Sequence, residues 1–105
     1  MKTASEIRFN YNQALARAQE LEEVASEMKS LANKELADSM QNLSTVWQGD
    51  SATAFLGKGA TLKEKVLKSA KGLEETATTI RNVAKRIYDA EMAAYRLAMA
   101  RKYND

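Results

Sequence analysis

The chain has 105 residues, a length typical of one domain. Histidine and cysteine are both absent, which excludes disulfides, thiolate nucleophiles, imidazole bases and the common zinc ligands. The net charge is only +2, and Lys and Arg alternate with Glu and Asp, which argues against nucleic-acid binding. We therefore expect no enzyme, no cofactor, no metal ion and no nucleic-acid partner.

Residues 5–46 have the pattern of one long helix, because they contain neither proline nor glycine. Apolar residues recur there at alternating spacings of four and three, which is the heptad seam of a packed helix. The seam residues are Ile7, Tyr11, Ala14, Ala18, Leu21, Ala25, Met28 and Ala32. After a one-residue phase shift, the seam continues through Leu36, Met40, Leu43 and Val46. Because alanine is frequent on it, we expect a partner helix to approach closely.

The segment WQGDS at residues 47–51 interrupts the helical pattern. Gly49 suits the left-handed conformation of a helix C-cap, so we expect it to end the first helix. Asp50 or Ser51 can cap the next helix by accepting hydrogen bonds from its free N–H groups. A turn over residues 47–50 between two long helices predicts an antiparallel hairpin.

A second helix is predicted over residues of about 51–100, with a possible flexible tail after it. Its apolar line comprises Phe55, Leu62, Val66, Ala70, Leu73, Ala77, Ile80, Ala84, Ile87 and Ala94. Gly57, Gly59 and Gly72 lie inside this helix. Two interpretations stay open for them, a close helix–helix contact or a loosened helix. The sequence around Lys58 lacks the spacing of a phosphate loop.

The apolar arc of each helix is wider than the single stripe that a two-helix hairpin buries. We therefore predict an all-α protein in which residues 1–105 form one hairpin domain that dimerises into a four-helix bundle. Exposed apolar surface without a partner is the alternative. The expected dimer-interface residues are Leu15, Leu21, Met28, Leu31, Met40, Trp47, Phe55, Leu62, Val66, Leu73 and Ile80.

The motif Trp47-x-Gly49 stands at the midpoint of a helical chain of about a hundred residues. This combination resembles the WXG family of type VII (ESX-like) secretion substrates. The resemblance implies a helical hairpin that forms homodimers or heterodimers. It also implies export from the cytoplasm by a membrane ATPase without a cleaved signal peptide. Trp47 would pack near the dimer contact, and Gly49 would close the turn.

The resemblance leaves the export signal open, since the family's C-terminal Tyr-x-x-x-Asp/Glu motif is absent. Tyr88 and Tyr95 are each followed four residues later by methionine. A looser tail pattern fits Ile87, Glu91, Ala94 and Ala98. The signal therefore lies either in this tail or in a partner protein.

Three functions follow from these observations. The first is a dimeric secreted effector or scaffold. The second is a cytosolic adaptor that pairs with a larger toxin carrying a similar hairpin and guides it to the secretion machine. The third is a membrane-active helix, which the basic, alanine-rich segment 88–102 favours.

Overall fold

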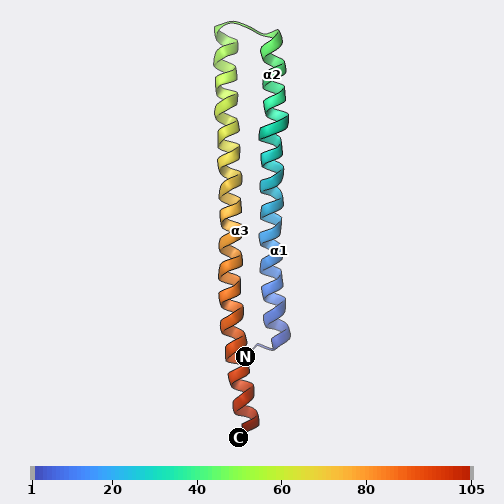
Figure 1. The fold of residues 1–105 in the computed structure, drawn as a ribbon, viewed down its shortest axis with the longest axis vertical. Helices are drawn as coiled ribbons and strands as arrows, with labels where there is room; N and C mark the ends of the chain where they lie inside the picture. The colour runs from blue at the N-terminus through green and yellow to red at the C-terminus, as the bar shows by residue number, and fades with distance from the viewer. Residues whose placement is uncertain (1, 105) are drawn as a thin grey trace. The chain divides into compact units, whose positions relative to one another are not determined.

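The computed structural model describes residues 2–104, and every secondary-structure element in that range is helical. Helix α1 spans Ala4–Ser30, a π-helical segment η1 spans Leu31–Leu36, and α2 spans Ala37–Val46 (Figure 1). After the turn, α3 spans Asp50–Asn104. The all-α class with two long helical arms is therefore confirmed. The second arm ends at Asn104 rather than near residue 100, so the residues after 100 that the structure describes are helical.

The π-helical segment η1 explains the one-residue phase shift of the first arm. Ser30 and Ala37, which flank it, both have right-handed helical backbone angles, so the arm does not break there. A π-turn accommodates one more residue than an α-turn. Ala32 is buried and Leu36 is half-buried, so the seam keeps its direction across η1. The extra residue in the sequence pattern is thus absorbed by the backbone.

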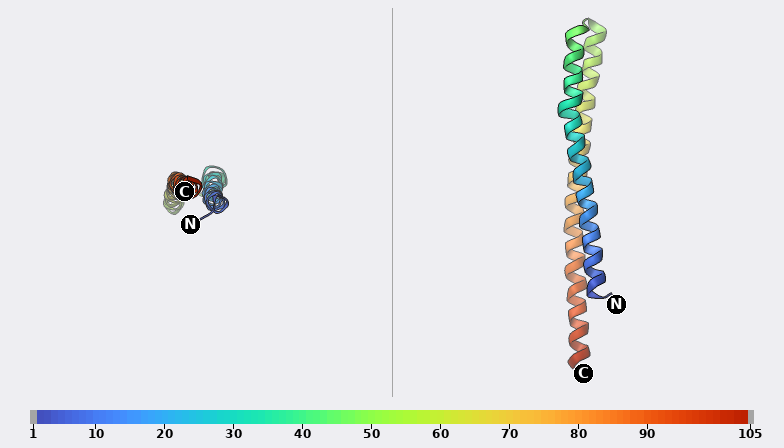
Figure 2. Two further views of the ribbon diagram at one scale, coloured as in Figure 1. Left: turned by 90° about the horizontal axis from the view of Figure 1, so that it is seen from below. Right: turned by 90° about the vertical axis from the view of Figure 1, so that its right-hand side faces the viewer.

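The chain divides into two compact units. The turn unit comprises Glu22–Glu75, and the terminal unit comprises Met1–Leu21 together with Thr76–Asp105. In each unit, a segment of α3 runs antiparallel beside a segment of the first arm, and the separate views agree on this pairing (Figures 1 and 2). The hairpin turn lies in the turn unit, and both chain ends belong to the terminal unit.

Alanine dominates the core of both units. In the turn unit the buried apolar residues are Ala25, Ala32, Ala52 and Ala70. In the terminal unit they are Ile7, Ala18, Ala77, Ala84 and Met92. Among the described residues, no large side chain is fully buried. Alanine lets two helices approach closely, as expected, but it removes little apolar area from water, so each unit has a thin core.

The seam of α3 differs from the expected apolar line. Phe55, Leu62 and Ile87 were assigned to that line, yet each exposes about half of its surface. Ala94 is exposed as well. The seam follows the buried alanines instead, because closely spaced helices accept only small side chains between them. The expected line therefore combines two neighbouring faces of α3.

The turn confirms the backbone angle expected at Gly49 and corrects its role. Gly49 has a φ of 110°. The C-cap of α2 is Trp47, whose backbone is extended and whose N–H donates to the Leu43 carbonyl at 3.0 Å. The Gly49 carbonyl accepts the N–H of Thr53 at 3.0 Å, so Gly49 starts α3 rather than ending α2. Asp50 already lies in the first turn of α3, where the positive end of the helix dipole favours an acidic residue.

The three helical glycines differ in their surroundings. A Cβ added at Gly59 would overlap Sδ of Met40 in α2 and lie 3.3 Å from its Cγ. A Cβ at Gly57 or Gly72 would meet nothing within 4 Å. Of the two open interpretations, close helix contact therefore holds for Gly59 and not for the other two glycines.

Candidate functional site

The candidate sites among residues 2–104 are exposed surfaces and shallow hollows. Among residues 2–104, no three acidic residues come together in a group that could hold a metal ion. None of the described helices is long and apolar enough to cross a membrane. Lys29 and Glu74 in the turn unit form an ion pair across the two arms, with 2.8 Å between Nζ and Oε1. Both side chains are more than two-fifths exposed, so this pair adds little stability.

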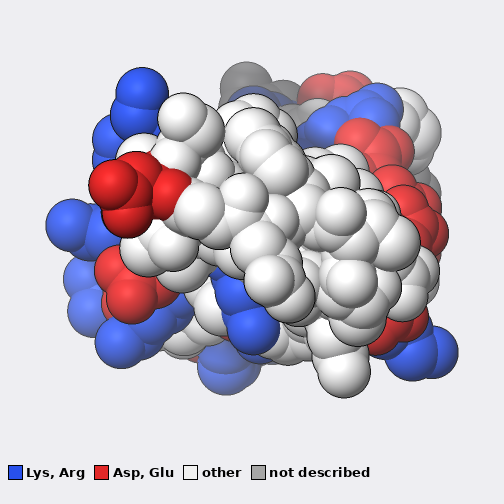
Figure 3. Space-filling model, turned by 90° about the horizontal axis from the view of Figure 1, so that it is seen from above, with Lys and Arg blue, Asp and Glu red and all other residues white. Residues whose placement is uncertain are grey.

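The end of the turn unit carries an apolar tip formed by Val46, Trp47 and Phe55. The ring centroids of Trp47 and Phe55 are 5.6 Å apart, with 50° between the ring planes. Val46 is 81% exposed, Phe55 53% and Trp47 38%. Viewed from this end, the protein shows a mostly uncharged surface with charged side chains mainly around its edge (Figure 3). Trp47 therefore packs on its own chain and also presents surface to solvent.

The expected interface residues fall into two groups. Leu31, Trp47, Phe55 and Leu62 are exposed and can meet a partner without any rearrangement. The others are half-buried beside the seam: Leu15, Leu21, Met28, Met40, Val66, Leu73 and Ile80. Part of each of these side chains is buried within its own unit, and the rest is accessible beside the seam.

The terminal unit has a shallow apolar groove. It consists of two hollows that share Ala14, Ala84 and Ile87; Ile80 and Val83 line one of them, and the polar Lys2 and Glu91 line the other. At one end of the groove, the rings of Tyr11 and Tyr88 stack with 4.8 Å between their centroids. Of the larger side chains beside it, Val83 and Ile87 are exposed, whereas Ile80 is half-buried.

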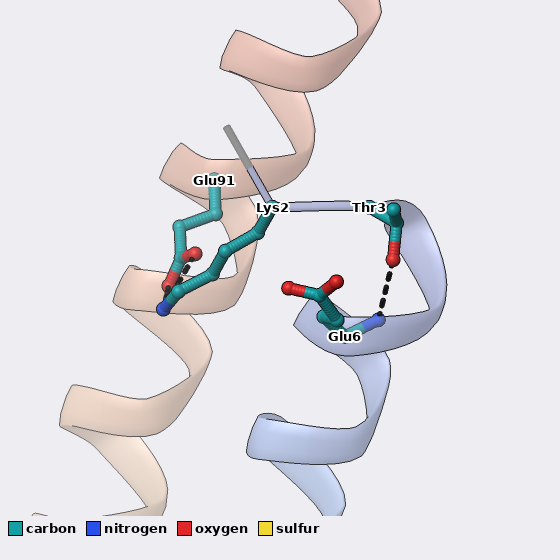
Figure 4. A network of polar contacts seen from close by, with 4 residues as sticks. All are labelled: Lys2, Thr3, Glu6 and Glu91. Atoms are coloured by element: carbon teal, nitrogen blue, oxygen red, sulfur yellow. Dashed lines mark hydrogen bonds and ion pairs between the residues drawn. The ribbon is translucent and has the colours of Figure 1, made fainter.

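Two polar contacts near the start of the first arm, Thr3 with Glu6 and Lys2 with Glu91, together form what we call the clasp. Thr3 accepts a hydrogen bond from the N–H of Glu6 on its hydroxyl oxygen at 3.1 Å (Figure 4). Lys2 forms an ion pair with Glu91 of α3, with 3.1 Å between Nζ and Oε2. Glu91 is the acidic residue of the expected export pattern, and its partner Lys2 lies just before α1.

Beyond Glu91, α3 continues to Asn104 past the beginning of α1 (Figure 1). Of the tail-pattern residues, Ile87 and Ala94 are exposed and Ala98 is half-buried. Leu97 and Tyr103 are also exposed apolar side chains. The export pattern therefore spans the clasp and the segment that follows it.

Sequence reasoning did not predict the exposure of three apolar residues, and it was wrong for Val46, which it assigned to the seam of the first arm. Phe9 is 61% exposed on α1, and Val46 and Tyr103 are more exposed still. Phe9 lies two residues after the seam residue Ile7, and that spacing off the seam is the signal that could have identified it.

Two long antiparallel helical arms without a strand among the described residues place the chain in the class of small all-α hairpin proteins. The sequence model of the WXG100 family, proteins of 100 residues with WXG, matches residues 6–92. The chain belongs to this family. No curated protein and no solved structure matches the chain significantly. Family membership fits a small, non-enzymatic protein exported by a type VII system.

Proposed function

We propose that this protein is exported by a type VII secretion system and acts as a dimeric secreted effector or scaffold. Family membership supports the export route. The membrane ATPase of that system is then the partner that receives the protein from the cytoplasm, without removal of a signal peptide.

The observation that best supports a dimer is that each unit buries small apolar side chains and exposes larger ones. In the turn unit, alanines fill the core while Val24, Leu31 and Leu62 lie on the surface. In the terminal unit, Val83 and Ile87 remain exposed beside an apolar groove. Larger apolar side chains stabilise a fold only when they leave water. A second hairpin covering these flanks supplies the missing burial.

Charge supports the same arrangement. Residues 1–46 carry seven acidic and five basic side chains, so their net charge is −2. Residues 50–105 carry seven acidic and eleven basic side chains, so their net charge is +4. When the first arm of one hairpin lies against α3 of another, opposite charges face each other at the rim of the contact.

The end of α3 is the segment best placed to dock on the export machinery. It lies beyond the family match, which ends at residue 92. It carries Arg96, Arg101 and Lys102 beside the exposed Leu97. A basic, amphipathic helix end suits recognition by another protein.

The second candidate is a cytosolic adaptor that forms a heterodimer with a larger toxin. The absence of the Tyr-x-x-x-Asp/Glu motif favours it, since a partner could then provide the signal. In this case the same exposed flanks bind the helical hairpin of the toxin.

Comparing cells with and without an active secretion ATPase tests the proposal. We expect the intact chain in the medium of the first cells only, while a cytosolic marker enzyme stays inside both. Retention in both, together with co-purification of a larger hairpin protein, would support the adaptor instead. Equal amounts in both media would overturn the type VII route.

A further inference from the structure

We propose that the part of the hairpin nearest the turn opens and closes as a unit of its own while the rest of the hairpin stays folded. This distal segment comprises residues 37–59, which are α2, the turn and the first part of α3 (Figure 1). It lies wholly within the turn unit. The inference concerns a single hairpin and does not depend on the export route or on the dimer.

The distal segment buries very little of its surface. Between Ala32 on the first arm and Ala70 on α3, a range that the structure describes throughout, Ala52 is the one buried residue. Outside this range, a buried alanine recurs every seven residues along both arms, from Ala18 to Ala32 and from Ala70 to Ala84. Removal of apolar area from water is the main term that stabilises a fold, so local stability should be lowest in the distal segment.

Helix α2 is also weak by its composition. Six of its ten residues are Asp, Ser, Asn, Thr or Val, which favour a helix less than alanine, leucine or lysine do. The Ser44 hydroxyl donates a hydrogen bond to the Gln41 carbonyl at 2.6 Å. The Thr45 hydroxyl likewise donates to the Asn42 carbonyl at 2.7 Å, and such local bonds offer the backbone an alternative to the helix. Because a helix this short is marginal in water on its own, α2 depends on α3 for its stability.

The backbone marks where the distal segment joins the rest of the turn unit. On the first arm, the segment begins directly after η1, and a π-helical turn is a common site of bending in a helix. On α3, it ends with Gly57 and Gly59, and glycine inside a helix favours the unfolded chain. We therefore place the two hinges of the opening motion at η1 and at this glycine pair.

Two side-chain contacts between the arms hold the distal segment closed. Met40 packs over Gly59, and the ring centroids of Trp47 and Phe55 lie 5.6 Å apart. Both contacts are local, and each can be lost without disturbing the buried alanines beyond the segment.

Opening changes which apolar surface the protein presents. Met40, Leu43 and Leu56 are half-buried in the closed hairpin, and separation of α2 from α3 uncovers them. A partner that binds these side chains selects the open form and shifts the population toward it. The distal segment thus acts as a conformational switch at the turn end of the hairpin.

Hydrogen–deuterium exchange of the purified full chain, followed amide by amide, tests the proposal. Relative to intrinsic rates, the amides of Met40 and Leu43 should exchange at least about tenfold faster than those of Ala25 and Ala77. Phe55→Ala removes the ring contact, so it should speed exchange at Leu43 by about fivefold and leave Ala77 unchanged. Equal protection along both arms would overturn the proposal.

Gly57→Ala and Gly72→Ala form a matched pair, because both glycines lie in α3 and an added Cβ meets nothing within 4 Å at either position. Gly57→Ala strengthens the distal segment, so it should slow exchange at Leu43 by up to about fivefold. Gly72→Ala should leave that rate unchanged, since residue 72 stays helical in the open form. Equal slowing by both variants would overturn the proposal, because exchange would then require the whole hairpin to unfold.

Discussion

Met40 of α2 lies over Gly59 of α3 so closely that a Cβ at Gly59 would overlap its sulfur. The two arms of the turn unit therefore approach at a position where only glycine fits without a shift of the Met40 side chain. Gly57, two residues earlier on the same helix, has open space around it. Substituting alanine at Gly57 changes helix propensity alone, whereas the same substitution at Gly59 changes both helix propensity and packing against Met40.

Gly57→Ala should stabilise the protein by up to about 1 kcal/mol, because alanine favours the helix over glycine. Gly59→Ala gains the same propensity but displaces Met40, so we expect it to be less stable than Gly57→Ala by about 1 kcal/mol. Urea unfolding measures both. In a Met40→Ala background, the difference in stability between Gly57→Ala and Gly59→Ala should become smaller, because the side chain that crowds position 59 is gone. Equal stability of the two variants in the native background would contradict the close contact.

The positive φ of Gly49 predicts a specific cost for any side chain in the turn. Gly49→Val should destabilise the fold by about 1–3 kcal/mol, since a β-branched residue rarely adopts this backbone conformation. Thermal unfolding followed by circular dichroism gives the value. Gly72→Ala is the control, because its φ is not positive and its surroundings are open, so it should not lower the melting temperature. An unchanged melting curve for Gly49→Val would refute the assigned turn.

The Tyr11–Tyr88 stack should stabilise the terminal unit, where the rings lie 4.8 Å apart. A double-mutant cycle with Tyr11→Ala and Tyr88→Ala should give a coupling free energy of about 0.5–1.5 kcal/mol. Tyr103→Ala serves as the control, since Tyr103 is 77% exposed and its loss should change stability little. A coupling energy of zero would mean that the stack contributes nothing.

Much of the fold could be predicted from residue spacing. The seam from Ile7 to Ala32 specified the first arm, and the phase shift after it corresponds to η1. The pattern did not show that the backbone would absorb the shift as a π-turn, because a break or a loop would give the same spacing. The angle at Gly49 followed from residue type, whereas its place at the start of α3 depended on which carbonyl accepts Thr53.

The candidate surfaces were harder to predict. Phe55 and Leu62 were assigned to the same line as Ala70, although they lie on an outer face. Neighbouring faces of a helix share the spacing of three and four residues, so spacing could not show which face of α3 is buried. The larger apolar side chains were assigned to the seam because they are more hydrophobic than alanine. The choice depends on the distance between the two arms, which alanines set and which no single-helix pattern contains.

Deleting residues 93–105 should separate folding from export. These residues follow the clasp between Lys2 and Glu91, and the family match ends before them. We expect the truncated chain to keep its oligomeric mass and the helicity of the remaining residues, but to be absent from the medium of cells with an active machine. The control Tyr103→Ala keeps the basic segment and should still be exported. A truncated dimer that is exported normally would place the signal in a partner.

The most direct test of the central claim is the mass of the purified protein in solution. Each unit buries mainly alanine and exposes larger apolar residues, so two hairpins should associate. Light scattering coupled to size exclusion at micromolar concentration should therefore give twice the chain mass of 11.7 kDa, with a fully helical spectrum. A monomer of 11.7 kDa that is equally helical and unfolds cooperatively would contradict the account.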